Sequence, residues 1–181
     1  RDPNIIYVGT GSDGLRSNVI IGKGVYKSID GGDTWQHMGL KDVGQIGEIA
    51  IHPDNYNVAY VSAIGNPFMP NPERGIYKTE NGGETWQKVL FISDKVGFYD
   101  IEMLPGNPSV LFATAWKAER KPWTIISGGN AKTEGGIYKS IDAGRTWKKI
   151  EKGLPTDLIG KIDIGTTPSD SKIIYAMVEA P

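Results

Sequence analysis

The chain has 181 residues, including 24 glycines and 11 prolines, and 39% of it is hydrophobic, which suits a turn-rich globular fold and argues against disorder. With 20 basic and 21 acidic residues the formal net charge is −1, so no charge excess indicates a nucleic-acid partner. Cysteine is absent, and no apolar run reaches the roughly 18 residues of a membrane helix, so neither disulfides nor membrane insertion are expected.

The first predicted element is a strand at residues 5–8 (IIYV), and a glycine-rich segment follows at residues 9–14 (GTGSDG). The same glycine spacing opens a helix in dinucleotide-binding loops. Here it is followed by LRSNVIIGKG, which lacks a helical period, so the segment is predicted to be a loop and no cofactor is expected. The histidines, His37 and His52, each stand alone, so no metal site is predicted either.

A motif of 12 residues comes next and recurs twice. Its copies are residues 24–35 (GVYKSIDGGDTW), 75–86 (GIYKTENGGETW) and 136–147 (GIYKSIDAGRTW). The tyrosine and the tryptophan are nine positions apart in every copy. Self-similarity of this kind indicates a repeat architecture, which takes precedence over local propensities.

Each copy is followed by a stretch that ends near a proline and a polar turn, and then by an apolar run. The turn prolines are Pro53, Pro105 and Pro168, and the aromatic residues Tyr60, Phe112 and Tyr175 come seven positions after them. Residues 5–8 supply a fourth copy of the apolar run. Runs rich in β-branched and aromatic residues between Gly, Pro, Asn or Asp favour strands. The unit therefore predicts four short strands with a period of about 50 to 60 residues, typical of a propeller blade.

These units predict an all-β fold, a partial β-propeller of about three and a half four-stranded blades. Counted from the axis outward, the chain supplies strands two to four, then two complete blades, then strands one and two. The predicted blade pieces are 1–39, 40–91, 92–151 and 152–181, in a single domain that is expected to be a fragment of a longer chain. A small all-β sandwich is the alternative.

The segment between the third and fourth strands of each unit predicts a tight hairpin tied by side-chain hydrogen bonds. An Asp or Asn oxygen accepts from nearby backbone N–H groups, glycine supplies a positive φ, and a Ser or Thr hydroxyl bonds the loop backbone. The tryptophan ring suits filling between neighbouring units. The residues with this structural role are Ser28, Asp30, Gly32 and Trp35, then Thr79, Asn81, Gly83 and Trp86, and finally Ser140, Asp142, Gly144 and Trp147.

The pattern Ser-x-Asp-x-Gly-x-Thr-Trp resembles the Asp-box, or bacterial neuraminidase repeat, and its three copies span most of the chain. Proteins with this repeat include sialidases, xyloglucan-active glycosidases, sortilin-type receptor propellers and photosystem assembly factors. The spacing is most similar to sortilin-like propellers of large secreted bacterial proteins, which are often labelled glycosyl hydrolases. The resemblance implies that the boxes lie at the blade periphery, away from active sites, and that the protein is extracellular or periplasmic.

Length varies most in the loops between second and third strands, and these loops share one face with the connections from a fourth strand to the next first strand. Function is expected on that face. The longest loop, 116–134, combines aromatic and basic residues that suit stacking and carboxylate binding, although its tryptophans could instead pack onto their own blade. Three prolines stiffen the loop 64–74. The ligand-binding candidates are Arg16, Phe68, Arg74, Trp116, Arg120 and Trp123.

The carboxylates of this face are weak candidates for catalysis. A glycosidase needs two carboxyl groups about 5 to 9.5 Å apart, and Glu73, Asp94, Glu119 and Asp157 are available on the rim. Glu73 and Glu119 are the weak catalytic candidates. A sialidase would also need an Arg-Ile-Pro motif, which is missing, and so is the xyloglucanase-type segment that carries an Asp beside paired glycines early in a blade.

The sequence therefore predicts a non-catalytic, sortilin-like recognition module that binds a peptide, a protein segment or a glycan across its loop-rich face. The remaining blades of the parent chain are expected as partners. A secreted glycoside hydrolase of sialidase or xyloglucanase type is the second hypothesis, and a purely architectural propeller is the third.

Overall fold

The computed structural model describes residues 2–16 and 18–181, and these residues form 16 strands. Every ladder between the strands is antiparallel, and helix does not occur in the described part of the chain. No segment there could cross a membrane as a long apolar helix. The prediction of an all-β fold is confirmed.

The strands form a row of sheets whose order follows the sequence. The first sheet contains β1 (Ile6–Gly9), β2 (Val25–Ser28) and β3 (Gln36–His37). The second contains β4 (Gln45–Ile51), β5 (Ala59–Gly65), β6 (Gly75–Thr79) and β7 (Gln87–Leu90). The third contains β8 (Val96–Leu104), β9 (Asn107–Arg120), β12 (Gly136–Ser140) and β13 (Lys148–Ile150), with β10 (Ile125–Ser127) beside β9. The fourth contains β15 (Ile162–Thr166) and β16 (Ile174–Val178), and β11 (Gly129–Asn130) pairs separately with β14 (Leu158–Ile159).

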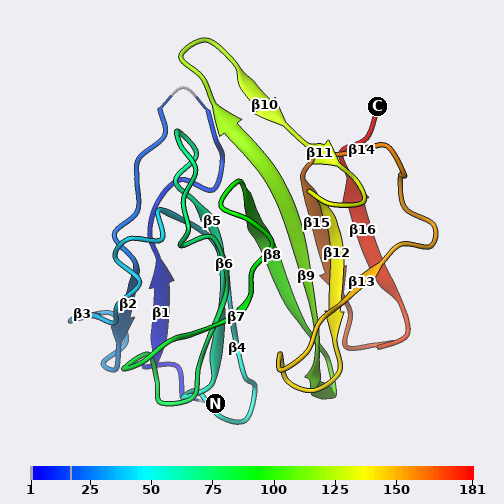
Figure 1. The fold of residues 1–181 in the computed structure, drawn as a ribbon. Coiled ribbons are helices and arrows are strands. Elements are labelled where there is room, and N and C mark those ends of the chain that lie inside the picture. Colours follow the sequence, from blue (N-terminus) through cyan, green and yellow to red (C-terminus); the bar gives the residue numbers. More distant parts are fainter. Residues whose placement is uncertain (1, 17) are drawn as a thin grey trace.

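The hydrophobic core lies between consecutive sheets. One cluster joins Tyr7 and Val25 of the first sheet to Val61 of the second. A second cluster joins the second and third sheets, and a third joins the third and fourth. Figure 1 shows the sheets fanned side by side from blue to red. Each four-stranded sheet therefore buries both faces against its neighbours, as propeller blades do.

The connections divide into two faces of the molecule. The loops that follow β1, β5 and β9 lie at the upper edge of Figure 1, whereas the turns between β2 and β3 and between β6 and β7 lie at the lower edge. The long hairpin of β9 and β10 projects furthest on the upper face. The upper face therefore carries the longer and more varied segments, as the sequence predicts.

Three hairpins, residues 28–35, 79–86 and 140–147, repeat one hydrogen-bonded arrangement, and we call them the motif hairpins. In the third, the Ser140 hydroxyl accepts the Gly144 N–H at 2.9 Å and donates to Asp142 Oδ1 at 2.8 Å. The same Asp142 carboxylate accepts the Thr146 N–H at 2.8 Å and the Thr146 hydroxyl at 2.6 Å. Gly144 has a φ of 81°, a value that a residue with a side chain rarely adopts.

The second motif hairpin keeps this arrangement without a carboxylate. Asn81 Oδ1 accepts the Thr85 N–H at 3.0 Å, and its amide nitrogen donates to the Thr85 hydroxyl at 2.9 Å. The Asn81 oxygen therefore takes the place of one aspartate oxygen as acceptor, and the Asn81 amide nitrogen takes the place of the other oxygen but donates a hydrogen bond. The charge on Asp30 and Asp142 is not required for the geometry.

The three hairpin tryptophans differ in what covers them. Trp86 donates its indole N–H to the Met38 carbonyl oxygen of the preceding sheet at 2.7 Å. Trp147 packs against the core between the second and third sheets. Trp35 bonds only its own loop, at Gly32, and its side chain is 44% exposed. Trp86 and Trp147 thus fill space between neighbouring sheets.

A hydroxyl on the second strand links each complete blade to the next one. In the second sheet the Ser62 hydroxyl accepts the Glu48 N–H at 2.7 Å and donates to the Tyr99 carbonyl of the third sheet at 3.0 Å. In the third sheet Thr114 accepts the Asp100 N–H at 3.1 Å and donates to the Ile162 carbonyl of the fourth at 2.9 Å. The same contact therefore recurs at two successive sheet boundaries.

The predicted loop 116–134 is wrong in its first half. β9 continues to Arg120, and β10 pairs with it in the register Ile125 to Arg120. Along the extension, Trp116 and Ala118 are buried whereas Lys117 and Glu119 are partly exposed. This alternation is the pattern of a half-buried strand, which the aromatic and basic composition of the segment concealed.

Candidate functional site

The loops of the upper face are joined to one another by hydrogen bonds. Arg120 donates its backbone N–H to the Pro67 carbonyl at 2.7 Å and its Nε–H to the Arg16 carbonyl at 3.0 Å. The connection before β8 joins through the Asp94 carbonyl, which accepts the Asn71 N–H at 2.7 Å. Hydrogen bonds therefore join segments that are far apart in the sequence, and these segments lie at the upper edge of Figure 1.

Arg74 lies beneath this surface and is only 2% exposed. Its guanidinium donates to the Ile64 carbonyl at 3.0 Å and to the Asn66 carbonyl at 2.6 Å, so it closes the loop 64–74 on itself. Arg74 Nε finds no hydrogen-bond partner among the described residues. Burial lowers the pKa of Arg74 to about 10, and the side chain therefore stays cationic at neutral pH.

A hollow of about 320 Å³ opens beside Arg74 on the same face. Cationic groups from three segments surround it, and Met69 and Pro70 give it an apolar wall. Lys117 pairs with Glu134 at 2.7 Å, and Glu119 pairs with Lys121, so part of the charge is already balanced. The lining residues are Met69, Pro70, Arg74, Lys95, Lys117, Ala118 and Glu119. This chemistry suits a ligand that places an acidic or polar group beside an apolar one.

The two tryptophans of the longest segment have opposite environments. Trp116 is 4% exposed, donates to the Ser127 hydroxyl at 2.9 Å, and meets the Tyr99 ring edge-on at 6.0 Å between centroids. The sequence predicts Trp116 as a ligand-binding residue, whereas a residue that is 4% exposed offers little ring surface for stacking. Trp123 is 97% exposed at the tip between β9 and β10, where its ring is available for stacking.

The other ligand-binding candidates also differ in their surroundings: Arg120 bonds the loop backbone, whereas Arg16 and Phe68 are exposed. The Arg120 guanidinium donates through Nε and one terminal nitrogen to the backbone carbonyls of Arg16, Lys121 and Thr124, so it shapes the loops. Arg16 and Phe68 are exposed on the loops that surround Arg120. Phe68, Trp123 and the hollow beside Arg74 are the parts of this face that remain open to a partner.

The four rim carboxylates differ in their partners and exposure. Glu73 accepts the Tyr77 hydroxyl at 2.9 Å and lies 3.8 Å from Lys88 Nζ. Glu119 is bonded by Lys121, which lowers the pKa of Glu119, whereas a general acid requires a raised pKa. Asp94 and Asp157 are exposed. Glu73 and Glu119 thus have lysine partners, whereas Asp94 and Asp157 are exposed to solvent.

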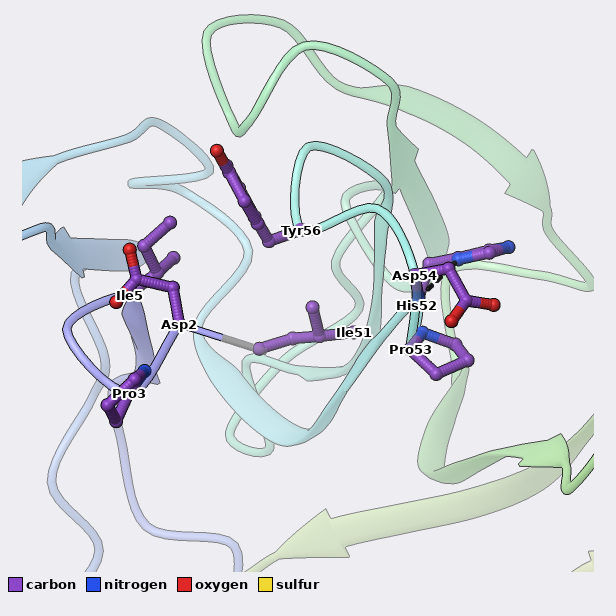
Figure 2. A pocket seen from close by; sticks show the side chains of 8 residues that line it. All are labelled: Asp2, Pro3, Ile5, Ile51, His52, Pro53, Asp54 and Tyr56. Carbon is purple, nitrogen blue, oxygen red and sulfur yellow. Dashed lines mark hydrogen bonds between the residues drawn. The ribbon is translucent and has the colours of Figure 1, made fainter.

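A larger open hollow, of about 980 Å³, lies between the segment before β1 and the turn that joins β4 to β5 (Figure 2). Ile51 and Tyr56 project into it and are partly exposed. His52 uses Nδ1 to accept the Asp54 N–H at 3.2 Å, so this histidine stabilises its own turn. The hollow offers apolar surface and no buried charged group among its lining residues, and we assign it no chemistry.

One cluster of functional groups escaped the sequence analysis. Glu48 on β4 and Asp100 and Glu102 on β8 bring carboxylate oxygens within 4.8 Å of one another. Burial, followed by the neighbouring Glu48, raises the pKa of Asp100 to about 8, and burial also raises the pKa of Glu102. The sequence does contain a signal for this cluster. An acidic residue, Glu48, Asp100 or Asp163, lies five positions before the turn proline in each unit.

Comparison with known proteins settles the family. The profile of the Sortilin-Vps10 family, described as sortilin, neurotensin receptor 3, matches residues 23–156. The chain belongs to the Sortilin-Vps10 family. The matched residues include all three motif hairpins and both complete blades, so the family profile matches the repeated part of the chain.

This Sortilin-Vps10 chain is also similar to xyloglucanases. Xyloglucanase Xgh74A of Acetivibrio thermocellus is 29% identical over 177 residues, which cover 87% of this chain and 19% of the relative. A xyloglucanase of a Paenibacillus species is 28% identical over 173 residues, which cover 86% of this chain and 16% of the relative. The chain thus spans less than a fifth of the length of these relatives.

A solved structure supports the propeller architecture. The GH74 xyloglucanase from Xanthomonas campestris superposes with a TM-score of 0.63 at 15% identity, covering 98% of this chain and 25% of that one. At this identity the likeness concerns the fold alone. The sheets of this Sortilin-Vps10 chain are therefore consecutive propeller blades, and the predicted partial propeller is confirmed.

Proposed function

We propose that this chain is a non-catalytic recognition module that binds a peptide or protein segment across its loop-rich face. The observation that carries the proposal is the hollow beside Arg74, where Lys95 and Lys117 stand next to the apolar Met69 and Pro70. Phe68 and Trp123 are exposed on loops of the same face and add apolar surface to it. Aromatic and cationic groups on a preformed surface are typical of binding sites.

Two further considerations favour binding over catalysis. The family description names a receptor for neurotensin, which makes ligand binding a natural function for a relative. The rim carboxylates of this chain are paired with Lys88 or Lys121 or are exposed, which suits contact with a partner better than acid catalysis. We further propose an extracellular or periplasmic location and contact with additional blades of a parent propeller.

Binding of short peptides and of xyloglucan oligosaccharides to the full-length protein tests the proposal. Trp123→Ala and Lys95→Ala are each expected to weaken peptide binding about tenfold, the loss typical of a residue at the centre of an interface. Tyr56→Ala is the matched control, since it removes an exposed aromatic ring from the opposite hollow. Unchanged affinity in both rim variants would contradict the proposal.

A second candidate function is that the chain forms part of a glycoside hydrolase that acts on xyloglucan. The observation that favours it is the 28–29% identity to xyloglucanases over most of this chain. Release of reducing sugar from xyloglucan by the full-length protein, abolished by Glu73→Gln or Glu119→Gln, would replace the first proposal by this one. Binding of oligosaccharide without turnover would retain the recognition role and change the ligand class to a glycan.

A further inference from the structure

The inner strands of three successive blades place acidic residues side by side. Glu48 lies on β4, Asp100 and Glu102 lie on β8, and Asp163 lies on β15. β4 and β8 are the first strands of adjacent complete blades, and β15 is the first strand of the next sheet. Because first strands line the axis of a propeller, these carboxylates gather at its inner edge.

Asp100 is the centre of the group and is only 1% exposed. Its Oδ2 accepts the Ile164 N–H from β15 at 2.6 Å, whereas its Oδ1 is buried and has no partner among the described residues. One carboxylate oxygen from each of Glu48, Asp100 and Glu102 lies within 4.8 Å of the other two. A carboxylate that has an unpartnered buried oxygen and two carboxylates nearby lacks a positive group.

Among the residues that the structure describes, no cationic side chain forms an ion pair with the cluster. The ion pairs formed by the described residues lie elsewhere, and the charged side chains that influence Asp100 and Glu102 are all acidic, including Asp163. Glu102 has one neutral partner, the Thr166 hydroxyl at 3.2 Å. Buried carboxylates are normally paired with a cation or coordinate a metal ion.

We propose that Glu48, Asp100 and Glu102 bind one calcium ion at the inner edge of the propeller. The donors are all oxygen atoms, which calcium accepts at about 2.3–2.6 Å in a flexible geometry, so oxygens up to 4.8 Å apart can share the ion. Zinc sites in proteins are usually built from nitrogen and sulfur ligands, and magnesium demands a stricter octahedron. Glu48 is exposed, which leaves an approach for the ion and for water ligands.

Bound calcium would connect three blades. Glu48 belongs to the second sheet, Asp100 and Glu102 to the third, and both β8 carboxylates also bond β15 through Ile164 and Thr166. An ion at this place therefore fixes the inner strands relative to one another. The calcium-loaded protein should resist thermal unfolding better than the calcium-free protein, since the ion binds the folded state alone.

The test is equilibrium dialysis of the metal-depleted full-length protein against calcium at neutral pH, with thermal unfolding as a second readout. Asp100→Asn is expected to bind one calcium ion fewer per chain, and Glu48→Gln to bind that ion about tenfold more weakly or worse. Glu48 is exposed, so its variant is expected to fold even if the Asp100 variant does not. Asp33→Asn, which alters an exposed acid in a motif hairpin, is the matched control.

Equal calcium stoichiometry and affinity in the unaltered protein, Asp100→Asn and Glu48→Gln would overturn the proposal. So would stabilisation by Asp100→Asn that is independent of calcium, because the cluster would then hold a proton rather than an ion. A lost site in Asp100→Asn, weakened binding in Glu48→Gln and an unchanged Asp33→Asn would establish it.

Discussion

The indole N–H of Trp86 donates to the carbonyl oxygen of Met38 at 2.7 Å, across the boundary between two blades. The ring also packs against the hydrophobic cluster that both sheets share. A residue of one motif hairpin thus stabilises the blade that precedes it. This relationship distinguishes Trp86 from Trp35, whose indole bonds only its own loop.

Replacing Trp86 by alanine should therefore destabilise the boundary between the first two blades. The variant loses the packed ring and leaves the Met38 carbonyl without its donor, so we expect a loss of about 3 kcal/mol in the local free energy of unfolding. Trp35→Ala is the control, with an expected loss of about 1 kcal/mol. Native-state hydrogen exchange of the strands on both sides of the boundary measures the difference. Equal losses in the two variants would contradict the assignment.

Ser140 offers a test of the hydrogen bonds inside a motif hairpin. Ser140→Ala leaves the buried Gly144 N–H without its acceptor, which should cost about 1–3 kcal/mol. Ser171→Ala, at an exposed hydroxyl with no hydrogen bond among the described residues, should change stability by less than about 0.5 kcal/mol. Chemical denaturation of the full-length protein, followed by tryptophan fluorescence, gives both values.

The motif hairpins should also confer sensitivity to acid. Hydrogen bonds from Thr34 and from Thr146 lower the pKa of Asp30 and of Asp142 to about 2, below the ordinary value of about 3.9. The stabilisation is therefore complete above about pH 4 and is lost as the pH falls toward about 2. Asp142→Asn should flatten the fall in melting temperature over this range, because Asn81 shows that an amide can keep the hairpin. An unchanged slope would mean that the carboxylate does not contribute.

Alanine variants of the two upper-face tryptophans should differ in thermal stability. Trp116→Ala removes a buried ring and its bond to Ser127, which should cost about 3–5 kcal/mol. Trp123→Ala changes an exposed ring and should alter stability by less than about 0.5 kcal/mol. Differential scanning calorimetry of the two variants checks this contrast. A stable Trp116 variant would restore that residue as a ligand-binding candidate.

The repeat in the sequence was enough to predict the blades and their order. Tyrosine and tryptophan nine positions apart determine where the third strand ends and the fourth begins, and the glycines with positive φ lie where the motif has them. The residue types of the motif also imply its hydrogen bonds, since Ser, Thr, Asp and Asn can all bond nearby backbone.

The site could be predicted only in part, because it depends on contacts between repeats. The extension of β9 escaped notice because its alternating burial is hidden among basic residues. The burial of Arg74 also escaped notice, because its residue type does not show that carbonyls of its own loop surround the guanidinium. The acidic cluster forms between blades, so the burial of Asp100 depends on β4 and β15 and not on its own strand.

The hydrogen bonds from the Ser62 and Thr114 hydroxyls affect how a propeller can gain blades. Both reach the backbone carbonyl of the residue that precedes an inner-strand acid in the next blade, Tyr99 or Ile162. Every residue has a backbone carbonyl, whatever its side chain. A duplicated blade therefore already carries the carbonyl that accepts the hydroxyl of the preceding blade. Growth by whole units then needs no new chemistry, and the size of the ring is governed by how much each unit turns relative to the last.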